Sequence, residues 1–174
     1  HHAIEPGRAG SAYRQMRQAD RNRESEVSRL VDALPDTEDT GAYVCDFETF
    51  KEIYRVQRGV QVRYSLPVFL AIITVAPGQN ADPEETSIMV EQLGELIHTS
   101  LRQCDVAARY TEMQYVVMLT GSAAETGSSP LERIKASFYR LPAHGRYLLS
   151  YSLYVPEIQP EGGPARSRRK TAKK

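Results

Sequence analysis

Residues 105–120 limit the fold of this chain more than any other part of the sequence. Apolar residues recur at every second position over 106–110, and residues 115–119 form an almost unbroken apolar run. Alternation predicts a strand with one buried face, whereas a short run rich in aromatic and β-branched residues predicts a strand buried on both faces. The stretch therefore predicts two neighbouring strands joined by a four-residue turn over 111–114.

The turn carries few groups that could do chemistry. It contains no glycine and no pair of acids, and Glu112 is its one side chain suited to a hard cation. Outside the turn, His98 has no second ligand at metal-binding spacing, so we expect no metal site. Cys45 and Cys104 suggest no disulfide framework, which fits a reducing cytoplasm, and we expect Cys104 to pack on an apolar helix face.

The rest of the globular part predicts alternating helices and strands. Asp46 and Asp82 are typical N-caps, and Pro83 suits the first position of a helix. The expected elements are an edge strand at 43–45, a helix over 47–63, a strand over 66–76, a helix over 83–104, the hairpin, a helix from 129 and a strand over 147–155. This order predicts an α/β (α+β) sandwich with a central, mostly antiparallel sheet flanked by helices.

Residues 41–155 resemble the GGDEF domain of diguanylate cyclases. Arg102-x-x-Asp105, a short strand, the turn and an apolar strand follow one another in that family's order and spacing. The resemblance implies the palm-like sheet of nucleotidyl cyclases. It places the family's signature, Gly-Gly-Asp/Glu-Glu-Phe, on Thr111, Glu112, Met113, Gln114 and Tyr115, where only the aromatic position is kept.

These substitutions predict a degenerate domain without catalytic residues, metal or cofactor. Two glycines would let the turn approach a phosphate, whereas a β-branched residue and an acid obstruct that approach. Met113 and Gln114 cannot act as carboxylate ligands or general bases. By the same resemblance, Thr74 and Ala76 stand where active cyclases keep metal-binding aspartates. We therefore expect no enzyme activity.

An alternative function is that of a cyclic di-GMP receptor. In the family, Arg-x-x-Asp forms an inhibitory product site, so Arg102 could bind a phosphate or guanine edge and Asp105 could accept from guanine N–H groups. A structural interpretation stands beside it, since an arginine at a helix C-terminus also satisfies terminal carbonyls and an aspartate often caps a turn.

The chain ends define the remaining predictions. We expect residues 1–40 to hold a tag remnant and a linker or signalling helix, which forms the end of an upstream domain. This helix is predicted in two pieces between residues 10 and 34. Residues 41–156 are predicted to form the GGDEF-like domain, and residues 157–174 a disordered basic tail. Six basic residues lie among the last nine, and non-specific nucleic-acid contact through them is a second alternative. Since the chain begins His1-His2, we expect a fragment of a longer protein.

The start of the domain also resembles the C-terminal domain of some clostridial transcriptional regulators, which carry a winged helix and a bacterial transcriptional activator domain upstream. Residues 41–55, Gly-Ala-Tyr-Val-Cys-Asp-Phe-x-x-Phe-Lys-x-Ile-Tyr-Arg, carry this resemblance. It implies a regulatory module of a bacterial signalling or transcriptional protein. The partners considered are an upstream DNA-binding or sensor domain in the same chain, cyclic di-GMP and a second copy in a homodimer. No stretch is apolar enough for a membrane span, so we expect a cytoplasmic protein.

Overall fold

The computed structural model describes residues 6–35, 41–121 and 128–157 of the 174-residue chain. The chain divides into two compact units, His1–Asp39 and Thr40–Lys174. The expected basic tail lies outside the described residues, apart from Glu157.

Within its described residues, 6–35, the first unit forms the helix α1, which runs from Pro6 to Ala33. The prediction of two helical pieces was wrong, because the polar stretch between them continues the helix. Residues 17–26 contain no glycine or proline, and contacts between successive turns link their side chains, such as the hydrogen bond from Gln18 to Asn22 at 3.2 Å.

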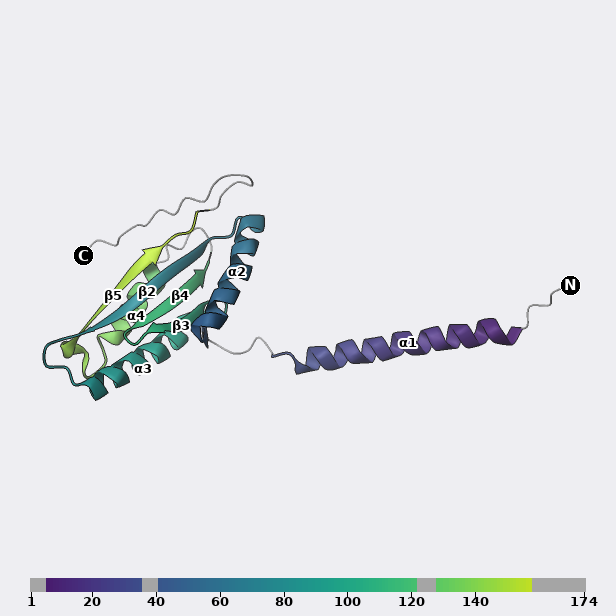
Figure 1. The fold of residues 1–174 in the computed structure, drawn as a ribbon, viewed down its shortest axis with the longest axis horizontal. Coiled ribbons are helices and arrows are strands. Elements are labelled where there is room, and N and C mark those ends of the chain that lie inside the picture. Colours follow the sequence, from purple (N-terminus) through teal and green to yellow (C-terminus); the bar gives the residue numbers. More distant parts are fainter. Residues whose placement is uncertain (1–5, 36–40, 122–127, 158–174) are drawn as a thin grey trace. The chain divides into compact units, whose positions relative to one another are not determined.

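The second unit is built on a five-stranded sheet with the order β1-β3-β4-β2-β5. Only β1 and β3 run parallel, and the other neighbours are antiparallel. In chain order the elements are β1 (Tyr43–Cys45), α2 (Phe47–Tyr64), β2 (Val68–Pro77), α3 (Pro83–Ser100), β3 (Val106–Thr111), β4 (Gln114–Thr120), α4 (Ser128–Phe138), a 3-10 turn η1 (His144–Arg146) and β5 (Tyr147–Tyr154). This confirms the predicted fold class (Figure 1).

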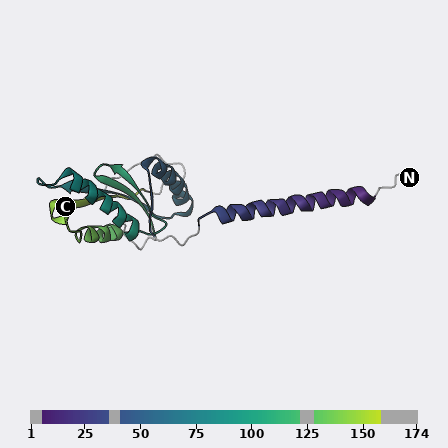
Figure 2. The ribbon, with the colours of Figure 1, turned by 90° about the horizontal axis from the view of Figure 1, so that it is seen from below.

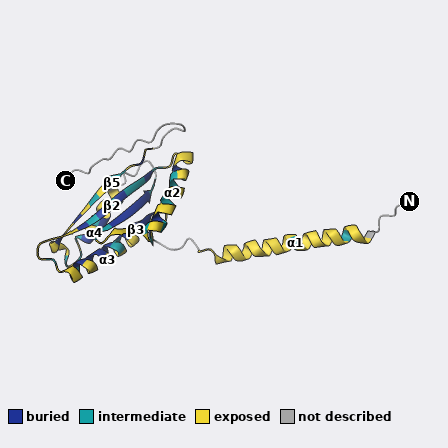
Figure 3. Ribbon diagram, viewed as in Figure 1, coloured by how far each residue is buried: buried dark blue, intermediate teal, exposed yellow. Residues whose placement is uncertain are grey.

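Helices cover both faces of the sheet, because β2 and β4 have apolar side chains on both sides. On one face, α3 and α4 pack against the sheet, and this pair can be followed in Figure 2. On the other face, α2 packs through Phe50 against residues of β3 and β4 such as Val106 and Met118. The strands buried between these layers are dark blue in Figure 3. The expectation that residues 115–119 are buried on both faces is confirmed.

The helix starts follow the predicted capping chemistry. The Asp46 carboxylate accepts a hydrogen bond from the Thr49 N–H at 2.7 Å, and Asp82 accepts from the Glu84 N–H at 3.4 Å, directly before Pro83. These caps set where α2 and α3 begin, so the start of α3 is fixed beside the end of β2.

The end of α3 differs from the prediction. The helix ends at Ser100 rather than at residue 104, and Leu101 is its C-cap. Cys104 consequently lies exposed in the turn that follows, so its assignment to an apolar helix face was wrong. The helical spacing of Leu101 and Cys104 misled the prediction, because the buried Asp105 carboxylate closes a turn there.

The chain leaves β5 across the C-terminal part of α2. Pro156 is buried, and its carbonyl accepts a hydrogen bond from the buried Gln61 side chain at 3.4 Å. Among the described residues, no helix combines the length and the apolar character that a membrane crossing requires.

Candidate functional site

The turn between β3 and β4 is tighter than predicted. Only Glu112 and Met113 form it, because Thr111 and Gln114 already pair as strand residues. Two-residue hairpins normally use positive φ, but among the described non-glycine residues only Ser65 has it. A register shift between Arg109 and Thr111 accompanies the turn instead, consistent with a β-bulge at the tip.

Arg109 holds the hairpin tip closed. Its guanidinium donates hydrogen bonds to the carbonyl oxygens of Thr111 at 2.9 Å and Glu112 at 2.5 Å. The same group lies 5.4 Å from the centre of the Tyr115 ring, within cation–π range. The Arg109 guanidinium is therefore bound to the backbone carbonyls and the aromatic ring of its own hairpin.

A chain of neutral side chains crosses the sheet at this end. The Thr111 hydroxyl donates to the Gln114 side-chain oxygen at 3.0 Å, and the Gln114 amide donates to the Thr74 hydroxyl at 3.1 Å. The pairings Thr111–Gln114 and Thr74–Gln114 place all three side chains on the same face of β3, β4 and β2. Ala76, the other position assigned to a metal-binding aspartate, lies exposed near the end of β2.

A cleft of about 510 Å³ lies between the hairpin tip and the start of α3. Its lining comes from the end of β2, the first turns of α3 and the hairpin: Pro77, Gly78, Ala81, Pro83, Thr86, Ser87, Val90, Arg109, Glu112 and Met113. Arg109 and Glu112 are its only charged residues, so the cleft is mostly apolar or small in character. Met113 contributes a thioether where the resemblance would require a carboxylate.

An ion pair braces the start of α3 near this cleft. Arg146 donates two hydrogen bonds to the Glu85 carboxylate, at 2.8 and 3.0 Å, and its backbone carbonyl accepts from the Gly78 N–H at 2.7 Å. The hydrogen bonds from Arg146 lower the pKa of Glu85 and raise the pKa of Arg146. Both charges are thereby paired with each other.

The residues at this end do not fit the metal ions that the resemblance implies for an active cyclase. Hard divalent cations take carboxylate, carbonyl and water oxygens, and the carboxylates supply the charge. Thr74, Ala76, Met113 and Gln114 supply none. Within residues 6–35, 41–121 and 128–157, no three His, Cys, Asp or Glu side chains group in a way that could hold a metal ion.

Arg102 and Asp105 lie together at the opposite end of β3, about 20 Å from the hairpin tip for a six-residue strand. Asp105 is buried, and its carboxylate oxygens accept hydrogen bonds from the Arg102 N–H at 2.9 Å and the Thr120 N–H at 3.1 Å. Its carbonyl accepts from the Tyr43 N–H at 2.9 Å. Asp105 thus joins the turn after α3 to β1 and β4, while Arg102 is exposed.

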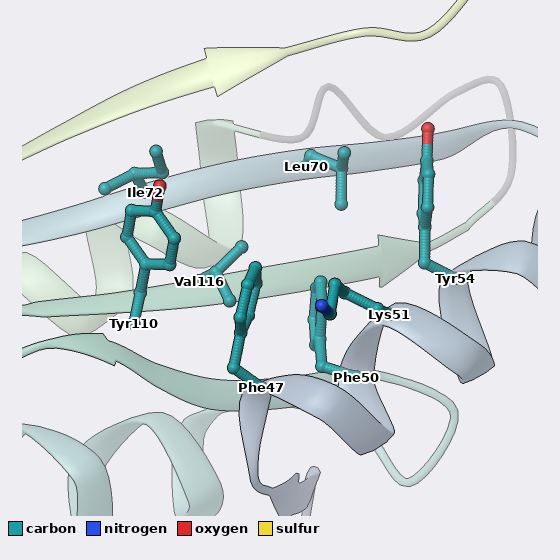
Figure 4. A pocket seen from close by; sticks show the side chains of 8 residues that line it. All are labelled: Phe47, Phe50, Lys51, Tyr54, Leu70, Ile72, Tyr110 and Val116. Carbon is teal, nitrogen blue, oxygen red and sulfur yellow. The ribbon is translucent and has the colours of Figure 1, made fainter.

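A second, apolar hollow of about 240 Å³ lies on the α2 face of the sheet, and the sequence analysis did not predict it. Figure 4 shows side chains from α2, β2, β3 and β4 around it. The Phe47 and Tyr110 rings meet edge to face at its rim, with centres 5.1 Å apart. Tyr110 is on the bulged part of β3, and a bulge cannot be foreseen from alternation alone.

Comparisons with solved structures identify the fold. The diguanylate cyclase SiaD of Pseudomonas aeruginosa, in complex with its activator SiaC, matches with a TM-score of 0.66 and 15% identity over 88% of this chain and 65% of that chain. The GGDEF domain of DgcB from Caulobacter crescentus, in complex with cyclic di-GMP, matches with a TM-score of 0.59 and 12% identity. The match covers 72% of this chain and 80% of that chain. The FimX GGDEF domain of P. aeruginosa matches with a TM-score of 0.53 and 19% identity. The match covers 72% of this chain and 83% of that chain.

The second unit of this chain therefore has the fold of GGDEF diguanylate cyclase domains, as the resemblance in the sequence implied. No family model matches the sequence, and neither does any curated protein sequence.

Proposed function

We propose that this chain is a catalytically inactive GGDEF-like module with a regulatory or interaction role in a bacterial signalling or transcriptional protein. The observation that carries the proposal is the neutral hydrogen-bonded chain from Thr111 through Gln114 to Thr74. Hydroxyl and amide groups cannot neutralise magnesium or take the proton from an attacking hydroxyl at neutral pH. In this proposal the fold remains while the chemistry has been lost.

The closed hairpin tip supports the same proposal. A phosphate-binding turn needs backbone N–H groups that a ligand can approach, which glycines allow. Here the carbonyls of Thr111 and Glu112 are tied to Arg109, and Glu112 adds a negative charge beside the cleft. A triphosphate in this cleft would be repelled by the Glu112 carboxylate. Arg109, the arginine in the cleft lining, already donates its hydrogen bonds to the turn.

Calorimetric titration of the full chain with GTP in the presence of Mg²⁺ tests this proposal. We expect no binding heat that depends on Mg²⁺. A Glu112→Gln variant serves as the matched control, since it removes the repulsive charge without restoring a metal ligand. Mg²⁺-dependent GTP binding by the wild-type chain would contradict the proposal.

The partner in this role is an upstream DNA-binding or sensor domain of the same protein, to which the N-terminal helix would lead. One solved neighbour, SiaD, was crystallised with a protein activator, which supports a role for this fold in contacts between proteins. A pull-down of the full-length gene product with and without residues 41–157 tests whether the module recruits a partner.

A second candidate function is cyclic di-GMP binding through Arg102 and Asp105. It is favoured by the exposure of Arg102 beside Asp105 and by a solved neighbour, the GGDEF domain of DgcB, in complex with this ligand. The two hydrogen bonds that Asp105 accepts from backbone N–H groups favour a structural role for this carboxylate instead. Calorimetry with cyclic di-GMP decides between them: binding lost in Arg102→Ala supports the receptor, and absence of binding removes it.

A further inference from the structure

Strand β5 forms one edge of the sheet, and β2 is the strand that pairs with it among the described residues (Figure 1). All 8 residues of β5 take part in that pairing. The opposite edge is β1, which has 3 residues and so offers little backbone to a partner. A longer edge strand presents unpaired backbone N–H and C=O groups to which another strand can bind.

The odd-numbered residues of β5 direct their backbone groups away from the sheet. The Val75 N–H donates to the Met113 carbonyl at 2.9 Å, so the odd-numbered residues of β2 bond towards β4. The even-numbered residues of β2 therefore bond towards β5, and their partners there are even-numbered, as in the pair Thr74–Ser150. Consequently the N–H and C=O groups of residues 147, 149, 151 and 153 point outwards.

The first part of this edge is already satisfied within the chain. The Tyr147 N–H donates to the His144 carbonyl. The Leu149 N–H donates to the Tyr139 hydroxyl at 3.0 Å, and that hydroxyl donates to the Leu149 carbonyl at 3.4 Å. The Tyr139 side chain thus caps both outward groups of Leu149, and no strand can pair there while this cap is in place.

The second part of the edge has no such cap. For the outward groups of Tyr151, Leu153 and Val155, the part of the chain that the structure describes supplies no hydrogen-bond partner. Residues 147–155 also contain no charged side chain and no proline. Edge strands are usually protected by charges, proline, a bulge or a covering segment, and uncharged segments of high β-propensity associate when they are left exposed. This part of β5 therefore requires a partner strand.

The uncapped residues define one symmetric register for an antiparallel partner. In a second copy of β5 centred on Leu153, Tyr151 lies opposite Val155 and Leu153 lies opposite Leu153 of the other copy. Each of these pairs exchanges both backbone hydrogen bonds. A register centred on residue 152 leaves Val155 unpaired, and a register centred on residue 154 leaves Tyr151 opposite Glu157, whose carbonyl accepts from Arg58 at 3.5 Å.

The ends of the uncapped segment agree with this register. Pro156 is buried, and its carbonyl accepts from the Gln61 side chain, so the chain turns towards α2 directly after Val155. The second copy consequently leaves the ladder before it reaches the cap that Tyr139 forms on Leu149. The same two features limit the pairing at both ends, because the two copies are related by two-fold symmetry.

The side chains also suit a second copy. Tyr151 and Leu153 belong to the apolar cluster on the α3 and α4 face, and they would lie beside Val155 and Leu153 of the other copy. On the α2 face, Ser152 would lie beside Tyr154. No like charges meet in this arrangement. The sequence that follows β5 is a poor alternative partner strand, because Pro160 and Pro164 lack the N–H that a ladder requires.

We propose that β5 pairs edge to edge with β5 of a second copy of this chain, antiparallel and about a two-fold axis at Leu153. The two sheets then continue as one sheet across the axis. The ground for choosing a second copy is that the uncapped, uncharged segment is complementary to itself. This inference does not depend on the proposed loss of cyclase chemistry.

Amide hydrogen exchange of the full chain, followed by NMR, tests the pairing. A strand pair of this length is a small interface, so the measurement runs from about 10 μM to about 1 mM protein. Exchange at Tyr151, Leu153 and Val155 should slow as the concentration rises. The Leu149 amide, which Tyr139 binds, should keep the same protection throughout. Equal exchange of the three amides at every concentration would overturn the proposal, whether they are always protected or always exposed.

Disulfide cross-linking tests the register. In a Cys45→Ser/Cys104→Ser background, Leu153→Cys should place two cysteines about 5.5 Å apart at Cα, within disulfide range. Ser150→Cys is the matched control on the same strand, because its two copies would lie about 20 Å apart. Under glutathione disulfide, the Leu153→Cys dimer should form several times faster than the Ser150→Cys dimer. Association through another surface would not favour Leu153→Cys, and equal rates would overturn the proposal.

A backbone variant tests the hydrogen bonds themselves. Val155→Pro removes an outward N–H without removing a bond to β2, since that ladder ends at the pair Leu70–Tyr154. It should slow the Leu153→Cys cross-link by roughly tenfold or more, because each dimer loses two hydrogen bonds. Val155→Ala keeps the N–H and is the control, and it should slow the cross-link much less. An unchanged rate in Val155→Pro, or equal slowing in both variants, would contradict the proposed pairing.

Discussion

Gln114 on β4 donates a hydrogen bond from its side-chain amide to the hydroxyl of Thr74 on β2, over 3.1 Å. The two residues are direct cross-strand neighbours. Their neutral contact occupies the end of the sheet where the resemblance to cyclases calls for acids. It gives the strand pair a satisfied polar contact that needs no ion.

This contact predicts how the protein responds to restored acids. Thr74→Asp combined with Gln114→Glu puts two carboxylates side by side, which should lower the free energy of unfolding at neutral pH by about 1 kcal/mol. Mg²⁺ or mild acid should recover the loss, because like charges raise the pKa of both carboxyl groups. Urea unfolding with and without Mg²⁺ measures this, with Thr74→Asn as the neutral control. An equal effect of Mg²⁺ on the wild-type protein would contradict the account.

Asp105 is predicted to be a structural residue. Asp105→Ala removes an acceptor from the backbone N–H groups of Arg102 and Thr120, so the free energy of unfolding should fall by about 3 kcal/mol. Arg102→Ala keeps the backbone N–H that Asp105 binds, so it should cost less than Asp105→Ala. Chemical unfolding of the two variants checks the contrast, which equal losses would refute.

Two helical glycines should respond in opposite directions to alanine. A Cβ at Gly94 would lie 2.5 Å from the hydroxyl oxygen of the buried Tyr115, so Gly94→Ala should cost about 1–3 kcal/mol. A Cβ at Gly59 would have no atom within 4 Å. Because alanine has the higher helix propensity, Gly59→Ala should raise the free energy of unfolding by about 0.5–1 kcal/mol. Thermal unfolding measures whether each variant is more or less stable than the wild-type protein. A stabilised Gly94→Ala would show that α3 and β4 are packed more loosely.

Tyr151 predicts a loss of stability in alkali. Burial, and then its 2.5 Å hydrogen bond to Glu132, raise the pKa of Tyr151 to about 12. Since an unfolded tyrosine has a pKa of about 10, this group stabilises the fold below pH 10, and its contribution disappears as the pH rises from 10 towards 12. The free energy of unfolding should therefore fall less steeply over that range in Tyr151→Phe. Identical slopes would remove this role for the β5–α4 contact.

The sequence predicted the layered part of the fold because burial imposes periodicity. The predicted ends of β2 and β5 agree with the structure to within two residues, and the capped starts of α2 and α3 agree directly. The continuity of α1 and the bulged turn were missed. An exposed polar helix has no burial pattern, and a bulge depends on how one strand pairs with the next.

The candidate site was predictable only in part. Given the resemblance, the sequence shows Met113 and Gln114 at the positions where the family's signature has acids, so the loss of these acids could be predicted. The link from Gln114 to Thr74 joins residues 40 positions apart, and it depends on the register of β2 against β4, which composition does not encode. The same applies to the buried contacts of Asp105, whose spacing from Arg102 suggested a ligand site.

The most direct measurement of the central claim is cyclic di-GMP formation from GTP and Mg²⁺ by the purified chain, followed by chromatography over many hours. The account predicts no product above that of a buffer blank, because neither Thr74 nor Gln114 can supply the charge that the reaction needs. Mg²⁺-dependent product that disappears in Gln114→Ala, purified in parallel, would contradict it.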